Sequence, residues 1–219
     1  MVCHSQQRCW CPISVLCEKP RCYPWFKPQH VTTHKQHLQN RIKIRHNSSI
    51  RHLLITQASQ TLVYSLALSR LDHCNSLLSR CPQYLLRKLQ NVQNTAAKLV
   101  SKAKESDHIH HILQSLHWLP LTHHTQYKIS TICFNSISGK SPQFLSDLIQ
   151  PYIPTRKLLS ALDTCTFTTP HVNTKLFGER SFFYTSPSVW NNLPWTLCHC
   201  DSSSSFKTTL KTHLFKNCF

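Results

Sequence analysis

The sequence predicts a mainly α protein: a helical bundle with a few short strands in the C-terminal third and an irregular, Cys- and Pro-rich N-terminus. Three observations predict this class. Apolar residues recur at helical spacing from Leu38 onward, prolines interrupt the chain before that point, and two short β-prone runs lie within 162–185. We expect an irregular segment at 1–35, a helical region at 36–155, and a tail region with short strands and a terminal helix at 156–219.

The first 35 residues lack any regular hydrophobic period. Pro12, Pro20, Pro24 and Pro28 recur every few residues, which is typical of irregular or disordered chain. Five of the 12 cysteines lie within the first 22 positions, separated by gaps of one, four or five residues. Zinc sites pair their ligands two to four residues apart, and the set as a whole matches no standard zinc finger, so we expect no metal here.

Two longer helices are predicted next. Within 53–71, one amphipathic face carries Ile55, Ala58, Leu62, Val63 and Leu66. The stretch from Leu85 to Ala103 is the most regular in the chain, because its apolar residues alternate steps of four and three. Polar and basic residues occupy its opposite face, so we expect an amphipathic helix of about five turns.

Shorter elements complete the prediction. A short helix is expected around 108–113, before Pro120, and another over 123–138 that ends at Gly139. The second of these should bury Ile129, Ile132, Cys133 and Ile137. Ser141 and Pro142 are expected to start a helix that Pro151 stops near residue 150.

The C-terminal third changes character. Cys165–Thr168 alternates and Phe182–Tyr184 is aromatic, so each predicts a short strand, closed by Pro170 and Pro187 respectively. The chain returns to helix after four serines at 202–205. There the apolar residues are spaced four apart and lysines take the other faces: Phe206, Leu210, Leu214, Lys207, Lys211 and Lys216.

Composition excludes several classes of enzyme. The 219 residues contain 25 Lys and Arg against 8 Asp and Glu, and the formal net charge is +17. Only 2 residues are Gly, which is too few for a phosphate-binding loop or a dinucleotide fingerprint. Among the acids only Glu105 and Asp107 are close in sequence. We therefore expect a basic, non-enzymatic module that meets polyanions and holds no cofactor.

The basic residues around the long helix are the main candidate site. No acid occurs between Arg80 and Lys104. Such an excess of positive charge attracts phosphate backbones through counterion release, although a charge stripe is often only a solvated face. The candidate nucleic-acid-binding residues are Arg70, Arg80, Arg87, Lys88, Lys98 and Lys102.

Other clusters favour ordinary surface roles. Cys198, His199 and Cys200, with His213 and Cys218, are too closely spaced for a standard metal site. The histidines at 108, 110, 111, 117, 123 and 124 have no well-placed carboxylate partner. No nucleophile motif or Gly-rich turn surrounds any Cys, which disfavours a Cys–His hydrolase. We expect no catalytic and no metal-binding residues.

The sequence also bears on location. No apolar secretory segment of 7–15 residues opens the chain. The least charged stretch, 53–69, contains too many Ser, Thr and Gln residues to span a membrane. We expect an intracellular protein, nuclear or cytoplasmic and not secreted, with reduced thiols and no membrane partner.

Six short strings resemble, in this order, segments of one protein family. They are Leu68–Leu78 (similar to SRLDYCNSLL), Leu89–Val100 (LQRVQNAAARLV), His108–Pro120 (HI…LHWLP), Gly178–Phe182 (GDRAF), Trp190–Pro194 (WNSLP) and Phe206–Phe215 (FKxxLKTxLF). In this order they resemble the carboxy-terminal region of LINE-type, non-LTR retrotransposon reverse transcriptases. The resemblance runs from about Leu38 to Phe219 and does not include residues 1–35. Arg80 stands where the family often has Gly, and His73 replaces a Tyr.

The resemblance implies a post-catalytic region, helical and thumb-like, followed by a tail. A polymerase thumb packs against the template–primer duplex, in agreement with the basic helix. The polymerase chemistry needs paired metal-binding aspartates, and no Asp-Asp pair occurs in this sequence. The endonuclease part is also absent.

Three hypotheses follow. The first is a catalytically inert fragment that binds RNA or DNA backbone nonspecifically. The second is the product of a relic reading frame without a selected role. The third is a protein-interaction module whose exposed helix surface once faced the missing polymerase palm and now binds another protein.

Overall fold

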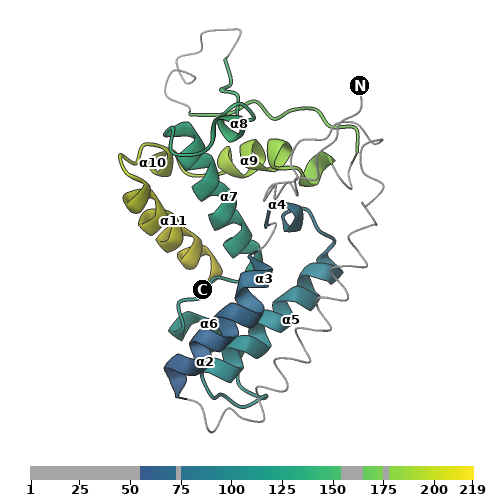
Figure 1. Ribbon diagram of the computed structural model, residues 1–219, viewed down its shortest axis with the longest axis vertical. Helices are drawn as coiled ribbons and strands as arrows, with labels where there is room; N and C mark the ends of the chain where they lie inside the picture. Colours follow the sequence, from purple (N-terminus) through teal and green to yellow (C-terminus); the bar gives the residue numbers. More distant parts are fainter. Residues whose placement is uncertain (1–54, 73–74, 154–164, 175–177) are drawn as a thin grey trace, which may run out of the picture.

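The computed structural model describes residues 55–72, 75–153, 165–174 and 178–219 (Figure 1). These residues are mostly helical, so the main part of the predicted fold class is confirmed. The predicted irregular segment 1–35 lies outside the described residues, as does the beginning of the helical region at 36–54.

The first described helix is interrupted by a π-helical turn. Helix α2 (Thr56–Val63) continues through the π-helix η1 (Tyr64–Leu68) into α3 (Ser69–Leu71). The Ser65 hydroxyl donates to the Leu62 carbonyl, and such side-chain competition for carbonyls loosens the regular ladder. The predicted apolar face is wrong at its start, because Ile55 is 78% exposed. Val63, a member of the predicted face, is buried, and Ser59 and Ala67 complete the buried side.

The predicted long amphipathic helix is confirmed. After the short α4 (Asn75–Leu78), helix α5 runs over Gln83–Val100. Its apolar face packs against α2 and η1 through a compact cluster. The buried members of this cluster are Val63, Ala67, Val92, Ala96, Leu99 and Val100.

Helices α6 (Ile109–Ser115) and α7 (Leu121–Ile137) follow, close to their predicted positions. Gly139 has a φ of 67°, as expected for a left-handed cap. The burial predicted for α7 is right for Ile129 and Cys133 but wrong for Ile132 and Ile137, which are 37% and 45% exposed. Because α7 contacts helices on several sides, small polar residues are buried there. These are Thr125, Ser130 and Ser136.

The predicted strand at Phe182–Tyr184 is wrong. After α8 (Gln143–Ser146) and the 3-10 turn η3 (Gly178–Arg180), residues Phe182–Trp190 form helix α9. The Ser181 hydroxyl caps this helix by accepting from the Tyr184 amide. Pro187 lies inside the helix and is fully buried, so it does not close the element as predicted.

The second predicted strand, Cys165–Thr168, is extended chain without a sheet. An isolated antiparallel bridge joins Pro151 to Phe167, and the described residues contain no other strand pairing. The flanking amides bond across this bridge: Tyr152 donates to Thr166 at 3.0 Å and Thr168 donates to Gln150 at 2.9 Å. The predicted few short strands are therefore wrong for these residues.

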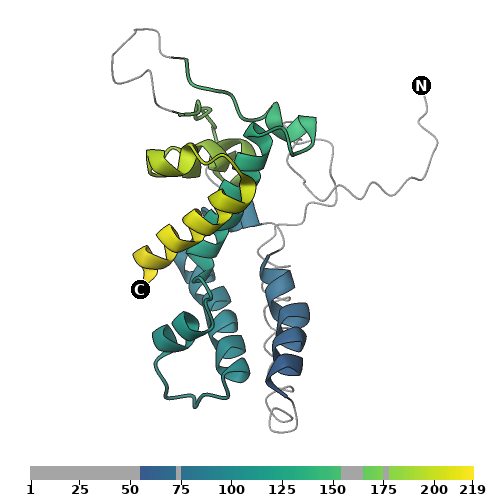
Figure 2. The ribbon, with the colours of Figure 1, turned by 90° about the vertical axis from the view of Figure 1, so that its left-hand side faces the viewer.

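The terminal helix is confirmed. Helix α10 (Trp195–Cys198) leads to α11 (Ser203–Cys218), whose first turn is capped by Ser202 accepting from the Ser205 amide. Figure 2 shows α11 lying across α7. Helix α9 also packs against α7, and α10 packs against α11. The predicted row of Phe206, Leu210 and Leu214 is buried.

An aromatic core joins α7, α9 and α11. The Phe134 and Phe206 rings stack with centroids 4.3 Å apart, and the Trp190 ring lies 5.8 Å from Phe206. The Trp190 indole N–H donates to the Cys165 carbonyl at 2.9 Å, which holds the extended segment to the core. Helices from the predicted 36–155 and 156–219 regions therefore share one core, and the boundaries drawn between them stay predictions.

Candidate nucleic-acid interface

Helix α5 presents a polar face that contains no acid. Its sequence, QYLLRKLQNVQNTAAKLV, has no Asp or Glu at any position. Arg87 and Lys98 are eleven residues apart, or three helical turns, so they share one side of the helix. That side lies opposite the buried residues Val92, Ala96 and Leu99. The helix therefore shows positive charge and no negative charge outward.

The N-terminal half of α5 carries two of the predicted residues. Arg87 and Lys88 are both exposed. The Lys88 amine lies 5.8 Å from the centre of the Tyr84 ring, and Tyr84 is itself 56% exposed. An exposed aromatic ring beside the Lys88 amine gives this end of the helix an apolar contact surface next to its charge.

The C-terminal end of α5 carries the other two. The Lys98 amine donates to the carbonyl of Glu105, which fastens the loop that follows the helix. Lys102 is exposed beyond the last turn and, among the described residues, forms no ion pair. Cations at this position also interact favourably with the negative end of the helix dipole.

Lys102 occupies a backbone position that usually belongs to glycine. Its φ is 54°, its amide donates to Leu99, and the Ala103 amide donates to Lys98. This is the Schellman pattern that closes helix C-termini. The same pattern closes α7 with Gly139 and closes α6 with His117, whose φ is also 54°. Two of the three caps thus hold a basic side chain in the left-handed conformation at a conformational cost.

Arg80 has partners within the protein. Its guanidinium donates to the Ser188 hydroxyl at 3.2 Å, lies 3.6 Å from the Glu179 carboxylate and stands over the Tyr184 ring at 5.2 Å. These contacts connect the turn after α4 with η3 and α9. Arg80 therefore makes contacts between elements of the fold, unlike the exposed cations of α5. Arg70 lies in α3, and its side chain is outside the described part.

A buried amide network fixes the position of α5. The Gln93 side chain donates to the Leu119 carbonyl at 2.8 Å, and the Leu121 amide donates to Gln90 at 2.8 Å. Gln90 also donates to Gln93 and to Asn94. These bonds join α5 to the start of α7. The helix that carries the basic face is therefore fixed by hydrogen bonds as well as by apolar packing.

A charged network holds α7 to the end of α3. The Asp72 carboxylate bonds to the His124 ring and lies 3.2 Å from the Lys128 amine. Partial burial alone raises the pKa of Asp72, but the hydrogen bond and charge of His124, with help from Lys128, outweigh it. The net effect is a pKa below the usual value for an aspartate.

The cysteines and histidines form no metal site in the described residues, where no group of three or more ligating side chains converges. Burial raises the pKa of both Cys198 and Cys218 to about 11, and it raises the pKa of the Cys133 thiol further still. These thiols stay protonated near neutral pH, which makes them poor nucleophiles. The N-terminal cysteine cluster lies outside the described residues.

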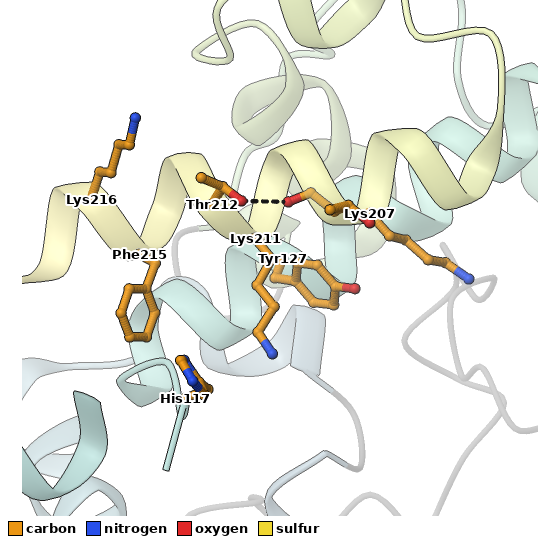
Figure 3. A pocket seen from close by; sticks show the side chains of 8 residues that line it. His117, Tyr127, Lys207, Lys211, Thr212, Phe215 and Lys216 are labelled. Atoms are coloured by element: carbon orange, nitrogen blue, oxygen red, sulfur yellow. Dashed lines mark hydrogen bonds between the residues drawn. The ribbon is translucent and has the colours of Figure 1, made fainter. Parts of the chain in front are cut away.

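The structure reveals a second basic feature that the sequence reasoning missed. A groove of about 510 Å³ lies along α11, against α7 and the turn after α6 (Figure 3). Its walls include Lys207, Lys211, Lys216, Tyr127, Phe215 and His117. The lysine spacing on the terminal helix was visible in the sequence. The contribution of His117 and Tyr127 was not, because they come from other elements.

No protein-family model, curated protein or solved structure significantly matches this chain. None of the helices in the described residues combines the length and the apolar character needed to cross a membrane.

Proposed function

We propose that this chain is the catalytically inert carboxy-terminal part of a non-LTR retrotransposon reverse transcriptase and binds RNA or DNA backbone nonspecifically through the basic face of α5. The observation that carries the proposal is that α5 exposes Arg87, Lys88 and Lys102 on or next to a helix without any acid. Such cations bind backbone phosphates without recognising the base sequence.

The contacts between the family-like strings support the resemblance. Gln93, in the LQNVQN string, donates to Leu119, in the LHWLP string. Asp72, in the SRLD string, holds α7. Trp190 and Asn191, in the WNNLP string, both bond to the extended segment 165–167. Residues that carry the resemblance thus hold distant parts of the fold together, as expected of a retained folding unit.

The geometry favours the outer part of α5 within the predicted site. Arg87, Lys88, Lys98 and Lys102 remain proposed phosphate contacts, because they lie on the polar side or at the C-terminal end of α5. Arg80 is proposed mainly as a structural tie, since its guanidinium already has three contacts.

The test is a binding titration of the full chain with a labelled 20-base-pair duplex over a range of salt concentrations. Phosphate contact predicts that log K falls linearly with log salt, by about 0.9 for each neutralised phosphate. Binding that is independent of salt would refute the proposal. Changing the duplex sequence should leave the affinity unchanged within a few-fold.

A second candidate is a protein-interaction module. It is favoured by exposed apolar side chains, among which Trp195 is 71% exposed and Ile137 is 45% exposed. Sedimentation of the full chain and its binding of a hydrophobic fluorescent dye test whether these side chains form exposed apolar patches. A monomer that does not bind the dye would refute this second candidate. A cooperative thermal transition of the full chain would separately argue against an unfolded relic product.

A further inference from the structure

The groove along α11 combines charge with aromatic surface. Lys207, Lys211 and Phe215 are spaced four residues apart, so they form one row on the helix. This row lies directly beside the buried row of Phe206 and Leu210, so the side chains leave the helix at the edge of the core. None of the residues that line the groove is acidic.

Two other elements complete the groove. Tyr127 comes from α7 and packs against the edge of the aromatic core. His117 comes from the cap of α6, and its exposed ring lies 5.8 Å from the Phe215 ring. Figure 3 shows Lys211 extending to the side where Tyr127 and His117 lie, whereas the Lys216 amine points to the other side of the helix. The groove is therefore lined by three rings and by lysines, of which Lys211 extends to the side of the rings.

This combination distinguishes between kinds of polyanion. In a duplex the base faces are covered by stacking, so the protein reaches phosphates and base edges only. In a single strand the base faces are free to stack on aromatic side chains while lysines contact the phosphates. A groove with only lysines would suit any polyanion. The rings of His117, Tyr127 and Phe215 add an interaction that unpaired bases alone can satisfy.

We infer that the α11 groove is a binding site for single-stranded nucleic acid, separate from the duplex-binding face proposed for α5. The lysines neutralise backbone phosphates, and bases stack on the rings of Phe215, Tyr127 and His117. Its volume of about 510 Å³ is comparable to sites that enclose a small-molecule ligand, typically about 300–1,000 Å³. The groove therefore has room for part of a single strand.

The backbone at His117 supports this assignment. Its φ of 54° is a conformation that glycine adopts at less cost. Replacing His117 with Gly should therefore keep or improve folding while removing one ring from the groove. A thermal melt of this variant checks that folding is kept, so that a loss of binding reports the missing ring.

The experiment measures fluorescence anisotropy of the full chain with a 20-nucleotide oligo-dT, a 20-base-pair duplex and a polyglutamate peptide as probes. Lys211→Gln should weaken oligo-dT binding and reduce its salt slope by about 0.7. His117→Gly should weaken oligo-dT binding about fivefold or more, the scale of one lost stacking contact. Lys140 is an exposed lysine outside the groove, so Lys140→Gln is the charge-matched control for Lys211→Gln. It should change neither the affinity for oligo-dT nor the salt slope.

The outcomes separate this inference from the proposed function. Arg87→Gln should weaken duplex binding and leave oligo-dT binding unchanged, so the two sites can fail independently. Polyglutamate binding that equals oligo-dT binding, together with no effect of His117→Gly, would overturn the inference in favour of a simple charged surface. Equal loss of duplex and oligo-dT binding in Lys211→Gln would overturn it as well.

Discussion

The side-chain amide of Asn191 forms with the backbone of Phe167 both hydrogen bonds that a neighbouring strand would supply. Asn191 Oδ1 accepts from the Phe167 amide at 2.9 Å, and Asn191 Nδ2 donates to the Phe167 carbonyl at 2.8 Å. A helix end thereby substitutes for a sheet. This explains why a segment with strand-like alternation stays extended although only one bridge pairs it.

Replacing Asn191 should lower stability more than a surface change does. Asn191→Ala removes two hydrogen bonds and leaves two partly buried backbone groups unpaired, for a loss of about 2–3 kcal/mol in the free energy of unfolding. Urea unfolding followed by circular dichroism measures this. Asn192→Ala, at the next position, is the control and removes one exposed bond to Ser188. Equal losses in the two variants would contradict the substitution of a strand by Asn191.

Lys102 in the left-handed cap should lower the stability of the fold and strengthen duplex binding. Lys102→Gly should raise the free energy of unfolding by about 1 kcal/mol, because glycine adopts a φ of 54° without strain. It should also weaken duplex binding, because one cation is lost. Gly139→Ala is the converse control: space around this glycine is open, so its expected loss of about 1 kcal/mol is conformational alone. A destabilised Lys102→Gly variant would contradict this account of the cap.

Asp72 should make stability depend on pH in the acid range. Its pKa is lower in the folded protein than in the unfolded chain, so its contribution is complete above the unfolded value near 3.8. The contribution is then lost as the pH falls through the lower folded value. Unfolding free energies at several pH values from 7 downward measure this loss.

Asp72→Asn tests the assignment of that pH dependence. The variant should be less stable at neutral pH and should show a flatter profile below pH 4. Because Asp72 is only partly buried, the expected loss at neutral pH is modest, on the order of 1 kcal/mol. A variant profile parallel to that of the original protein would assign the acid sensitivity to other groups.

Arg80 and Arg87 should respond differently to the same substitution. Arg80→Gln removes the contacts with Glu179 and Tyr184, so it should reduce stability by less than about 1 kcal/mol and leave the salt slope unchanged. Arg87→Gln should leave stability unchanged and reduce the salt slope by about 1. The paired titrations decide between a structural and a phosphate-binding role, and an exchange of the two results would refute the assignment.

The helices were predictable where burial is one-sided. Helix α5 packs against α2, η1, α6 and α7 but leaves one side exposed, so its apolar residues still form a regular stripe. Its start follows from Pro82, whereas it ends at Val100, three residues before the periodicity ends at Ala103. Helix α7 has neighbours on several sides, so its buried set includes Thr125 and Ser130 and excludes Ile132. Periodicity in the sequence identifies a single apolar face. It does not predict which residues are buried when other helices surround the helix.

The local preference of Phe182–Tyr184 was overridden by its context. Three consecutive aromatics favour a strand in isolation, but Ser181 caps a helix there and the core requires Phe182 and Trp190 on one side. In the candidate site, the cations of α5 were visible in sequence. The involvement of Arg80 with Glu179 and the groove built by His117 and Tyr127 depend on contacts far apart in the chain, which spacing alone does not report.

The most direct test of the central claim is the salt dependence of duplex binding by the full-length double variant Arg87→Gln/Lys102→Gln. The matched control, Arg80→Gln/Lys140→Gln, loses the same charge elsewhere on the surface. Our account predicts that the slope of log K against log salt falls by about 2 in the first variant and stays unchanged in the control. Equal slopes in both variants would contradict the claim that α5 presents the nucleic-acid-binding surface.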